Sequence, residues 1–146
     1  MIIKPYTHWF GLIVVLIGLL LPVHVFASIF VVVHPDRDIN NISPVQVANI
    51  FLGKTKRLSN GGLIIPVDQS RDSHTRNEFY SKLLNKNENQ MNVYWARQVF
   101  TGRSQPPVQV TNCNEVRLLV KDNPTFIGYI HSDCNDIGIK VILRIP

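Results

Sequence analysis

The run 63–76 reads LIIPVDQSRDSHTR, and it decides the class of fold. Its first five residues are apolar and predict a short β-strand, with the proline near a strand end. After a polar connection, Ser73 or Thr75 is expected to cap a helix, and Thr75 with Glu78 fits a capping box. A strand that leads directly into a helix is the building unit of an α/β domain.

The segments on either side of this run repeat the alternation. Apolar runs at 28–34, 126–130 and 137–145 predict further strands, and capped apolar patterns predict helices that begin at Ser43-Pro44, near Met91 and at Thr111 or Asn112. Within 137–145 the apolar residues recur with a period of two, so we expect one face of that strand to be exposed. This order predicts an α/β domain with a mixed, mostly parallel sheet flanked by about four helices.

The N-terminal segment 1–27 has a different composition from the rest of the chain. It contains no acidic residue, it has Lys4 near its start, and an apolar run extends from Trp9 to Leu21. This is the pattern of a secretory signal peptide, with cleavage expected after Ala27. A retained membrane anchor is the alternative, but a run of roughly 13 residues is shorter than the roughly 20 that a spanning helix needs. We therefore expect 28–146 to be one exported, periplasmic domain with no stable transmembrane anchor after cleavage.

The charge and cysteine content narrow the classes of partner and of chemistry. The chain has 146 residues and a formal net charge of +5, but no run of five or more basic residues, so we expect no nucleic-acid partner. The two cysteines, Cys113 and Cys134, allow one disulfide in an exported compartment, and two free thiols are the alternative. A bridge would close a loop of about 20 residues and contribute on the order of 3 kcal/mol.

The loop between the central strand and its helix is the candidate binding site. A helix N-terminus offers unpaired N–H groups and a partial positive charge, which attract anions. The residues that would add hydroxyl, amide, imidazole or guanidinium contacts to a phosphate or another oxyanion are Gln69, Ser70, Arg71, Ser73, His74, Thr75 and Arg76. The alternative is that these hydroxyls only cap their own helix, and Asp68 and Asp72 would repel an anion.

Catalytic chemistry has little support in the sequence. The chain has no Gly-x-Ser-x-Gly elbow and no phosphate-binding Walker loop, and Ser73 beside His74 does not by itself form a nucleophile–base pair. His34, His74 and His131 are too widely separated for metal-ligand spacing. We therefore expect no catalytic residues, no metal and no cofactor, and a small exported hydrolase is the weakest of the alternatives.

Several segments together resemble a known family, the small stand-alone members of the phosphate ABC transporter substrate-binding proteins. The similarity covers nearly all of 28–146 in the same order. It rests on VQVANIFLGK at 45–54, Ile65-Pro66-Val67, Phe79, Tyr94-Trp95, Phe100-Thr101-Gly102, Pro106-Pro107 and NPTFIGYI at 123–130.

The resemblance implies a type II periplasmic-binding-protein fold, and 28–146 is long enough for about one lobe of it. In the family's phosphate loop an arginine precedes a serine-glycine-threonine run. By spacing to Phe79 the arginine position falls on Gln69 and the glycine position on His74, whereas Ser73 and Thr75 match. The resemblance implies a non-enzymatic module that binds phosphate or another small anion. The alternative is an adaptor that has lost its ligand and serves a membrane transporter or a sensor protein such as a membrane kinase.

Overall fold

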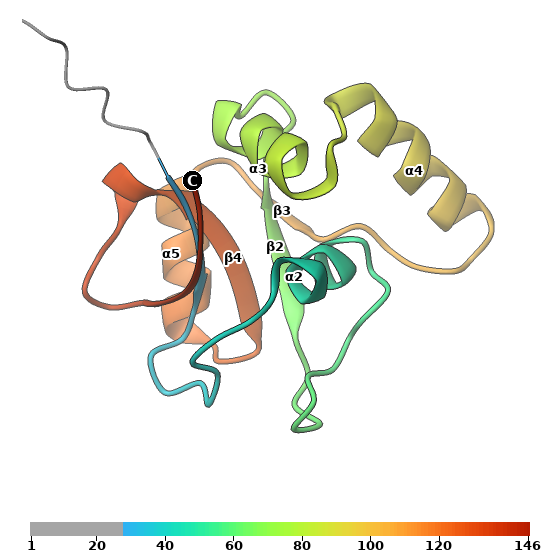
Figure 1. Cartoon of the computed structure of the whole chain (residues 1–146). Helices are drawn as coiled ribbons and strands as arrows, with labels where there is room; N and C mark the ends of the chain where they lie inside the picture. The colour runs from blue at the N-terminus through green and yellow to red at the C-terminus, as the bar shows by residue number, and fades with distance from the viewer. Residues whose placement is uncertain (1–27) are drawn as a thin grey trace, which may run out of the picture.

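The computed structural model describes residues 28–146, so the predicted signal peptide at 1–27 lies outside the described residues. A five-stranded sheet forms the centre (Figure 1), in the order β3-β2-β4-β1-β5. The strands are β1 (Ile29–Val33), β2 (Ile65–Gln69), β3 (Val108–Val110), β4 (Phe126–His131) and β5 (Lys140–Ile145). β1 is antiparallel to both of its neighbours, and the other four strands run in one direction. The predicted mixed, mostly parallel sheet is confirmed.

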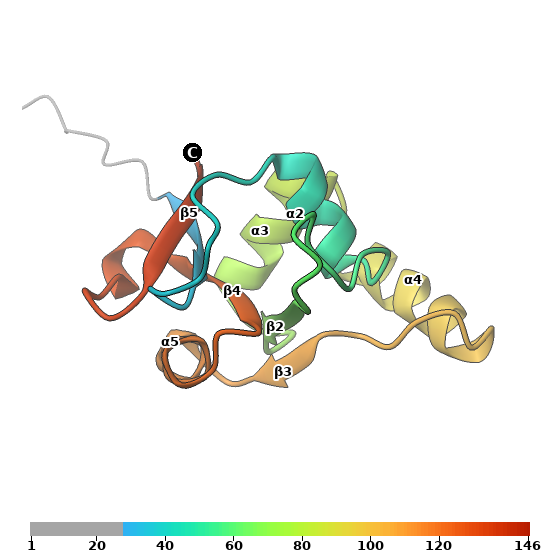
Figure 2. The same ribbon diagram turned by 90° about the horizontal axis from the view of Figure 1, so that it is seen from below.

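Helices cover both faces of the sheet (Figure 2). α2 (Pro44–Phe51) and α3 (His74–Leu84) lie on one face and α5 (Cys113–Asp122) lies on the other, while α4 (Glu88–Phe100) projects beyond the sheet beside α2 and α3. Two apolar clusters follow from this layering, one on each side of the sheet. Every residue of β1 is buried, as its unbroken apolar run predicts, because both faces of this strand are covered.

Local signals in the sequence explain where α2 begins and ends. The Ser43 hydroxyl accepts from the Gln46 N–H, and the Gln46 side chain accepts from the Ser43 N–H, which completes a capping box. Gly53 follows the helix with φ +68°, a conformation that side chains rarely adopt. A Cβ at this position would also lie 2.2 Å from Ser104 Oγ, so the glycine lets the segment after α4 approach the end of α2.

Pro66 lies in the part of β2 that does not pair with β3, so its lack of an N–H removes no hydrogen bond to β3. β2 pairs with β4 at Ile65 and Pro66, but β3 pairs only with the part of β2 from Val67 onward. The proline therefore precedes the part of the strand that pairs with β3, near the strand start. The strand extends two residues further than expected, because Asp68 and Gln69 continue the pairing with β3 and are buried.

The prediction of a simple alternation in the last strand is wrong. Val31 pairs with Leu143 and Val32 pairs with Val141, so Ile142 is an extra residue and forms a β-bulge. The bulge reverses which side chains face which side of the sheet. Val141 packs with the cluster under α5, whereas buried Ile142 and Ile145 pack with the cluster under α2 and α3. Both faces of β5 are therefore partly covered, because the bulge shifts the pleat by one residue.

Within residues 28–146, no helix combines the length and the apolar character needed to cross a membrane.

Candidate anion-binding site

The start of α3 is fixed by Ser73, which is the N-cap residue of the helix. Its hydroxyl accepts from the Arg76 N–H at 3.3 Å and donates to Gln69 Oε1 at 2.8 Å. The predicted capping box of Thr75 with Glu78 is wrong, because the helix begins two residues earlier and Thr75 is its second residue. Of the two capping residues that the sequence allows, the structure selects Ser73.

A hollow of about 570 Å³ opens in front of this helix start. Five of the seven predicted ligand residues line it, namely Gln69, Ser70, Ser73, His74 and Thr75. Its other walls come from Asp72, from the start of α5 and from the end of β4 and the short 3₁₀ helix η2 (Ser132–Cys134), through Thr111, Asn112, Cys113, His131, Asp133 and Cys134. The hollow therefore lies at the carboxyl ends of β2, β3 and β4, where open α/β sheets place their ligands.

The helix start faces this hollow with backbone donors. The first N–H groups of an α-helix have no carbonyl partner within the helix, and those of α3 belong to His74 and Thr75. The Ser73 hydroxyl satisfies only the third N–H, that of Arg76. At the start of α5, by contrast, the Asn112 side chain accepts from the N–H groups of both Asn114 and Glu115. Free donors are therefore concentrated at the tip of α3.

Arg76 does not line the hollow. Its side chain is buried, its Nε donates to Asp68 Oδ2 at 3.0 Å, and its Nη1 pairs with Glu88. The guanidinium thus neutralises two carboxylates from β2 and α4 and has no charge to spare for an anion. Arg71 is exposed and is also absent from the lining, so neither predicted arginine contributes to this hollow.

Gln69 and His74 occupy the two positions at which the sequence departs from the family pattern. The Gln69 side chain is fully used, because its amide nitrogen donates to Tyr129 O at 3.1 Å and its oxygen accepts from Ser73. The His74 side chain is 91% exposed and lies 3.8 Å from a Glu78 oxygen, so it stands in solvent at the edge of the hollow.

The charge in the hollow is mixed. Asp72 and Asp133 both line it and oppose the approach of an anion. One of the two carboxylates is engaged, because His131 Nδ1 lies 2.7 Å from Asp133 Oδ1. The favourable groups are the Thr75 hydroxyl and the amides of the α3 tip, all of them uncharged, because the Ser70 hydroxyl already donates to Thr111 O at 3.4 Å. This arrangement suits a weak, hydrogen-bonded anion and lacks the guanidinium that would add a charge-assisted bond.

Below the hollow, Asp68 is the centre of a buried polar network. It accepts from the Tyr80 hydroxyl at 2.9 Å, from the Tyr129 hydroxyl and from Arg76. Burial is the main cause that raises the pKa of Tyr80 and of Tyr129 well above the usual value, and the nearby Asp68 carboxylate adds to the effect. Both phenols therefore stay protonated and remain donors. This network is invisible in the sequence, because its members are up to 61 residues apart.

A disulfide joins the start of α5 to the short helix η2. Both elements line the hollow, and neither of them was predicted from the sequence as part of the site. Cys113 at the start of α5 is bonded to Cys134 at the end of η2, with Cα atoms 6.5 Å apart. The bridge brings the loop after β4 against the helix that covers the far side of the sheet. The cysteine pair was the only sequence signal for this second wall.

Within residues 28–146, no three His, Cys, Asp or Glu side chains lie close enough together to hold a metal ion.

Known structures share this fold, although no protein-family model and no curated protein sequence matches the chain. An ABC-type phosphate transport receptor from Vibrio cholerae superposes with a TM-score of 0.63 at 19% identity, over 80% of this chain and 45% of the receptor. A putative phosphate ABC transporter substrate-binding protein from Clostridium perfringens, solved with bound phosphate, gives 0.63 at 22% identity, over 80% of this chain and 44% of that protein. PstS from Borrelia burgdorferi gives 0.61 at 18% identity, over 80% and 46%.

The chain spans less than half the length of each of these structures, which agrees with the predicted single lobe. At sequence identities of 18–22%, the structural similarity shows a common fold. Over about four-fifths of its length, the chain has the fold of the phosphate ABC transporter substrate-binding proteins.

Proposed function

We propose that the protein is an exported, non-enzymatic solute-binding module that holds a small oxyanion, phosphate first, at the tip of α3. The observation that carries the proposal is the hollow at the carboxyl ends of the strands, which is lined by the first residues of α3 with their helix amides and by the Thr75 hydroxyl. A related fold has been solved with phosphate bound, which supports the choice of ligand class.

The affinity should be low, in the millimolar range. The hollow is open to water, which screens each polar contact, and a single lobe has no second lobe that would close over the anion and exclude the solvent. Asp72 and Asp133 add repulsion. Neither predicted arginine reaches the site, so the anion gains no direct partner of opposite charge.

Amide chemical shifts in a phosphate titration test the proposal. We expect the His74 and Thr75 amides of the purified protein to shift and saturate at millimolar phosphate, because these groups would donate to the anion. Thr75→Val should weaken the apparent affinity by about fivefold, since one hydrogen bond contributes about 1 kcal/mol. Ser81→Ala, on an exposed part of the same helix, is the matched control. Equal shifts with sodium chloride at the same ionic strength, or no saturation, would remove the ligand claim.

One observation favours a second candidate function, that of an adaptor without a ligand. Three predicted ligand residues use their polar side-chain atoms for hydrogen bonds within the protein, namely Gln69, Ser73 and Arg76. These atoms stabilise the fold and are not directed at a ligand. The protein would then act by binding a membrane transporter or a sensor protein. In that case phosphate would shift no amide, and Ser70→Ala with Thr75→Val would leave recovery of the membrane partner unchanged.

A further inference from the structure

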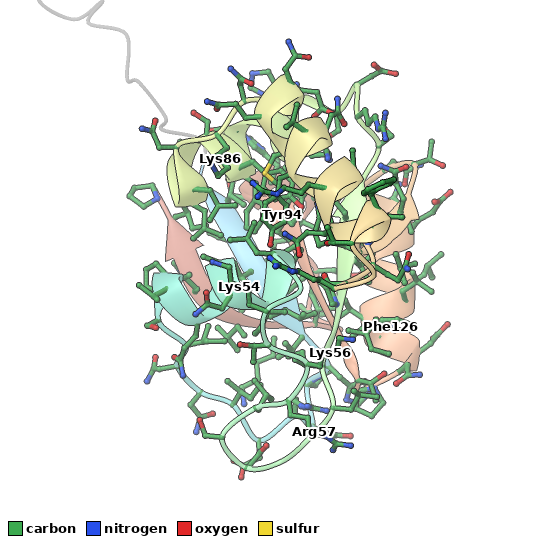
Figure 3. All side chains as sticks on the ribbon, turned by 90° about the vertical axis from the view of Figure 1, so that its right-hand side faces the viewer. Lys54, Lys56, Arg57, Lys86, Tyr94 and Phe126 are labelled. Carbon is green, nitrogen blue, oxygen red and sulfur yellow. A yellow bond between two sulfur atoms is a disulfide. The ribbon has the colours of Figure 1, made fainter. Side chains whose placement is uncertain are left out.

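Two segments supply the net positive charge of residues 28–146, although basic residues are scattered along the sequence. The segments 43–62 and 85–110 together contain six basic residues and one acidic residue, Glu88, which is paired with Arg76. Figure 3 shows Lys54, Lys56, Arg57 and Lys86 on a single face, with Lys86 near α4 and Arg57 toward the opposite end of the molecule. We call the surface formed by these two segments the basic face. The other nine acidic residues of the chain lie outside both segments.

The same face exposes large apolar side chains on α4. Val93 is 70% exposed and Phe100 is 94% exposed. They are seven residues apart and therefore lie on the same side of the helix. The opposite side of α4 is held against the body by buried Met91 and Trp95, and by the Tyr94 hydroxyl, which donates to Leu52 O at 2.7 Å. The exposed side chains of Val93 and Phe100 are therefore held in place by a helix that is packed against the rest of the protein.

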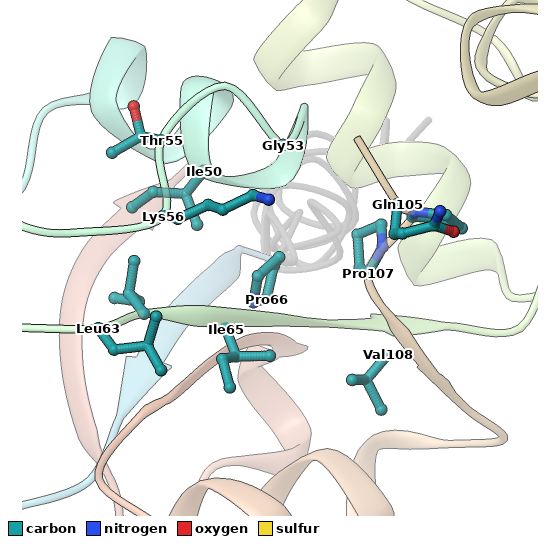
Figure 4. Close-up of a pocket in the computed structure, with 12 residues that line it drawn as sticks. Ile50, Gly53, Thr55, Lys56, Leu63, Ile65, Pro66, Gln105, Pro107 and Val108 are labelled. Atoms are coloured by element: carbon teal, nitrogen blue, oxygen red, sulfur yellow. The ribbon is translucent and has the colours of Figure 1, made fainter. Parts of the chain in front are cut away.

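An apolar cleft of about 170 Å³ lies on the basic face between the end of α2, the start of β2 and the segment that leads into β3. Leu63 and Val108, both more than two-fifths exposed, form part of its walls, together with Pro106 and Pro107. Lys56 extends from the α2 side toward the segment that carries Gln105 (Figure 4), so a cation stands beside an apolar hollow. A cavity of about 150 Å³ accommodates a benzene-sized group, so this cleft has room for one large apolar side chain.

We propose that the basic face docks an acidic segment of another protein, and that one large apolar side chain of that segment fills the cleft beside Lys56. The charge decides the class of partner, since an acidic segment meets six basic residues and almost no like charge. The two prolines in the cleft wall have no N–H to offer, so recognition is by side chains and not by strand addition.

Two other occupants fit these observations less well. A second copy bound through the same face would bring two sets of six basic residues together. An anionic membrane would satisfy the charge and the exposed stripe on α4, but a flat bilayer would leave the concave cleft unfilled. The cleft therefore favours a protein segment.

Selection from a library of random dodecapeptides tests the proposal on the purified protein. A parallel selection uses the variant Lys54→Glu/Lys56→Glu/Arg57→Glu, whose changed side chains are all exposed, so the fold should be retained, and circular dichroism checks this. We expect peptides rich in Asp and Glu with at least one Phe, Leu, Ile or Trp to be enriched about tenfold or more on the unchanged protein. A selection that enriches no peptide over the variant, or peptides without an acidic bias, overturns the proposal.

The affinity of one selected peptide for a set of variants then shows whether the peptide binds in the cleft or is attracted only by the net charge of the protein. Lys56→Glu and Leu63→Ser should each weaken binding by about tenfold, which corresponds to about 1.4 kcal/mol. Lys121→Glu and Ile137→Ser, which change an exposed cation and an exposed apolar residue outside the basic face, should stay within about twofold. Equal weakening by Lys121→Glu would reduce the effect to net charge and refute the site.

Two further measurements can overturn the choice of partner. Sedimentation of the protein with vesicles of equal parts phosphatidylglycerol and phosphatidylcholine, lost in Phe100→Ser, would point to a lipid surface. A dimer in sedimentation velocity that dissociates in Phe100→Ser would point to a second copy. The proposal expects neither result.

Discussion

At the scale of the residue, Asp68 shows how much one buried carboxylate can hold together. It accepts from two tyrosine hydroxyls and from the Arg76 guanidinium, and it thereby links β2, α3 and β4. The guanidinium lies 5.0 Å from the Tyr80 ring centre, which adds a cation–π contact. The position next to Gln69 places this network directly beneath the candidate binding site.

Asp68→Ala should lower the free energy of unfolding by about 3 to 5 kcal/mol, since it leaves two buried tyrosine hydroxyls without an acceptor and leaves Arg76 with Glu88 as its remaining carboxylate partner. Urea denaturation monitored by circular dichroism measures this. Asp72→Ala is the control, because Asp72 is exposed and should change the free energy of unfolding by less than about 0.5 kcal/mol. A similar small change in both variants would show that Arg76 and the tyrosines find other partners.

Gly128 illustrates a residue whose lack of a side chain is required by packing. A Cβ at this position in β4 would lie 2.4 Å from Cγ1 of Val116, a fully buried residue of α5. We predict that Gly128→Ala lowers the free energy of unfolding by about 1 to 3 kcal/mol, because α5 must move away from the sheet. Thermal or urea denaturation checks this.

Gly138→Ala is the matched control for that prediction. A Cβ there would meet only the flexible end of the Lys121 side chain, at 3.0 Å, and the lysine can move at little cost. If Gly138→Ala destabilised the protein as much as Gly128→Ala, close approach of α5 to β4 would not be the reason for the glycine.

At the scale of the element, the disulfide fixes the start of α5 relative to the loop after β4. The bonded residues are 21 positions apart, and closing a loop of this length stabilises a folded chain by about 3 kcal/mol. We predict that Cys113→Ala/Cys134→Ala lowers the free energy of unfolding by about this amount and that the amide signals of 111–115 and 131–135 shift most. An unchanged urea midpoint, with the untreated protein giving no free thiol, would contradict the prediction.

α4 presents one side to the core and the other to solvent. Its inner side buries Met91 and Trp95, and its outer side carries Val93 and Phe100. Two polar contacts also hold the helix in place, from the Tyr94 hydroxyl to Leu52 O and from Arg76 to Glu88. A helix held in this way can present an exposed surface to a partner while the sheet and the other helices keep the core closed.

At the scale of the whole molecule, stability should depend on pH in the alkaline range. The folded state raises the pKa of Tyr80 and of Tyr129, chiefly by burial, so the folded state binds these phenol protons more tightly than the unfolded chain does. Their contribution is complete below about pH 10, the ordinary tyrosine pKa, and it is lost as the pH rises further.

We therefore predict that the free energy of unfolding falls steeply above about pH 10. The two buried phenols should ionise together when the protein unfolds, which appears as a cooperative rise in tyrosinate absorbance. Urea denaturation at a series of alkaline pH values measures the slope, and Tyr129→Phe, which has one such phenol fewer, should show a shallower slope. Early, non-cooperative ionisation of Tyr80 and Tyr129 would contradict their burial.

Much of the architecture could be predicted because its signals are local. The Ser43-Pro44 start of α2, its end at Gly53 and the continuous apolar run of β1 each depend on neighbours within one or two turns. The site was predicted less well. Its loop was placed correctly at the end of β2, but Arg76 was expected to face the ligand, and its partner Glu88 is supplied by another helix. Nor could the pattern of β5 reveal the bulge at Ile142, which arises in the pairing with β1.

By itself, the sequence determined the α/β class, the helix starts and the location of the candidate loop, because hydrogen bonds to nearby amides and the spacing of apolar residues act over short distances. Only the tertiary structure decided which polar groups remain available, since Gln69, Ser73 and Arg76 find their partners through packing. It also brought Lys86 onto the same face as Lys54, Lys56 and Arg57, which lie in a separate segment of the chain, because α4 folds back beside α2.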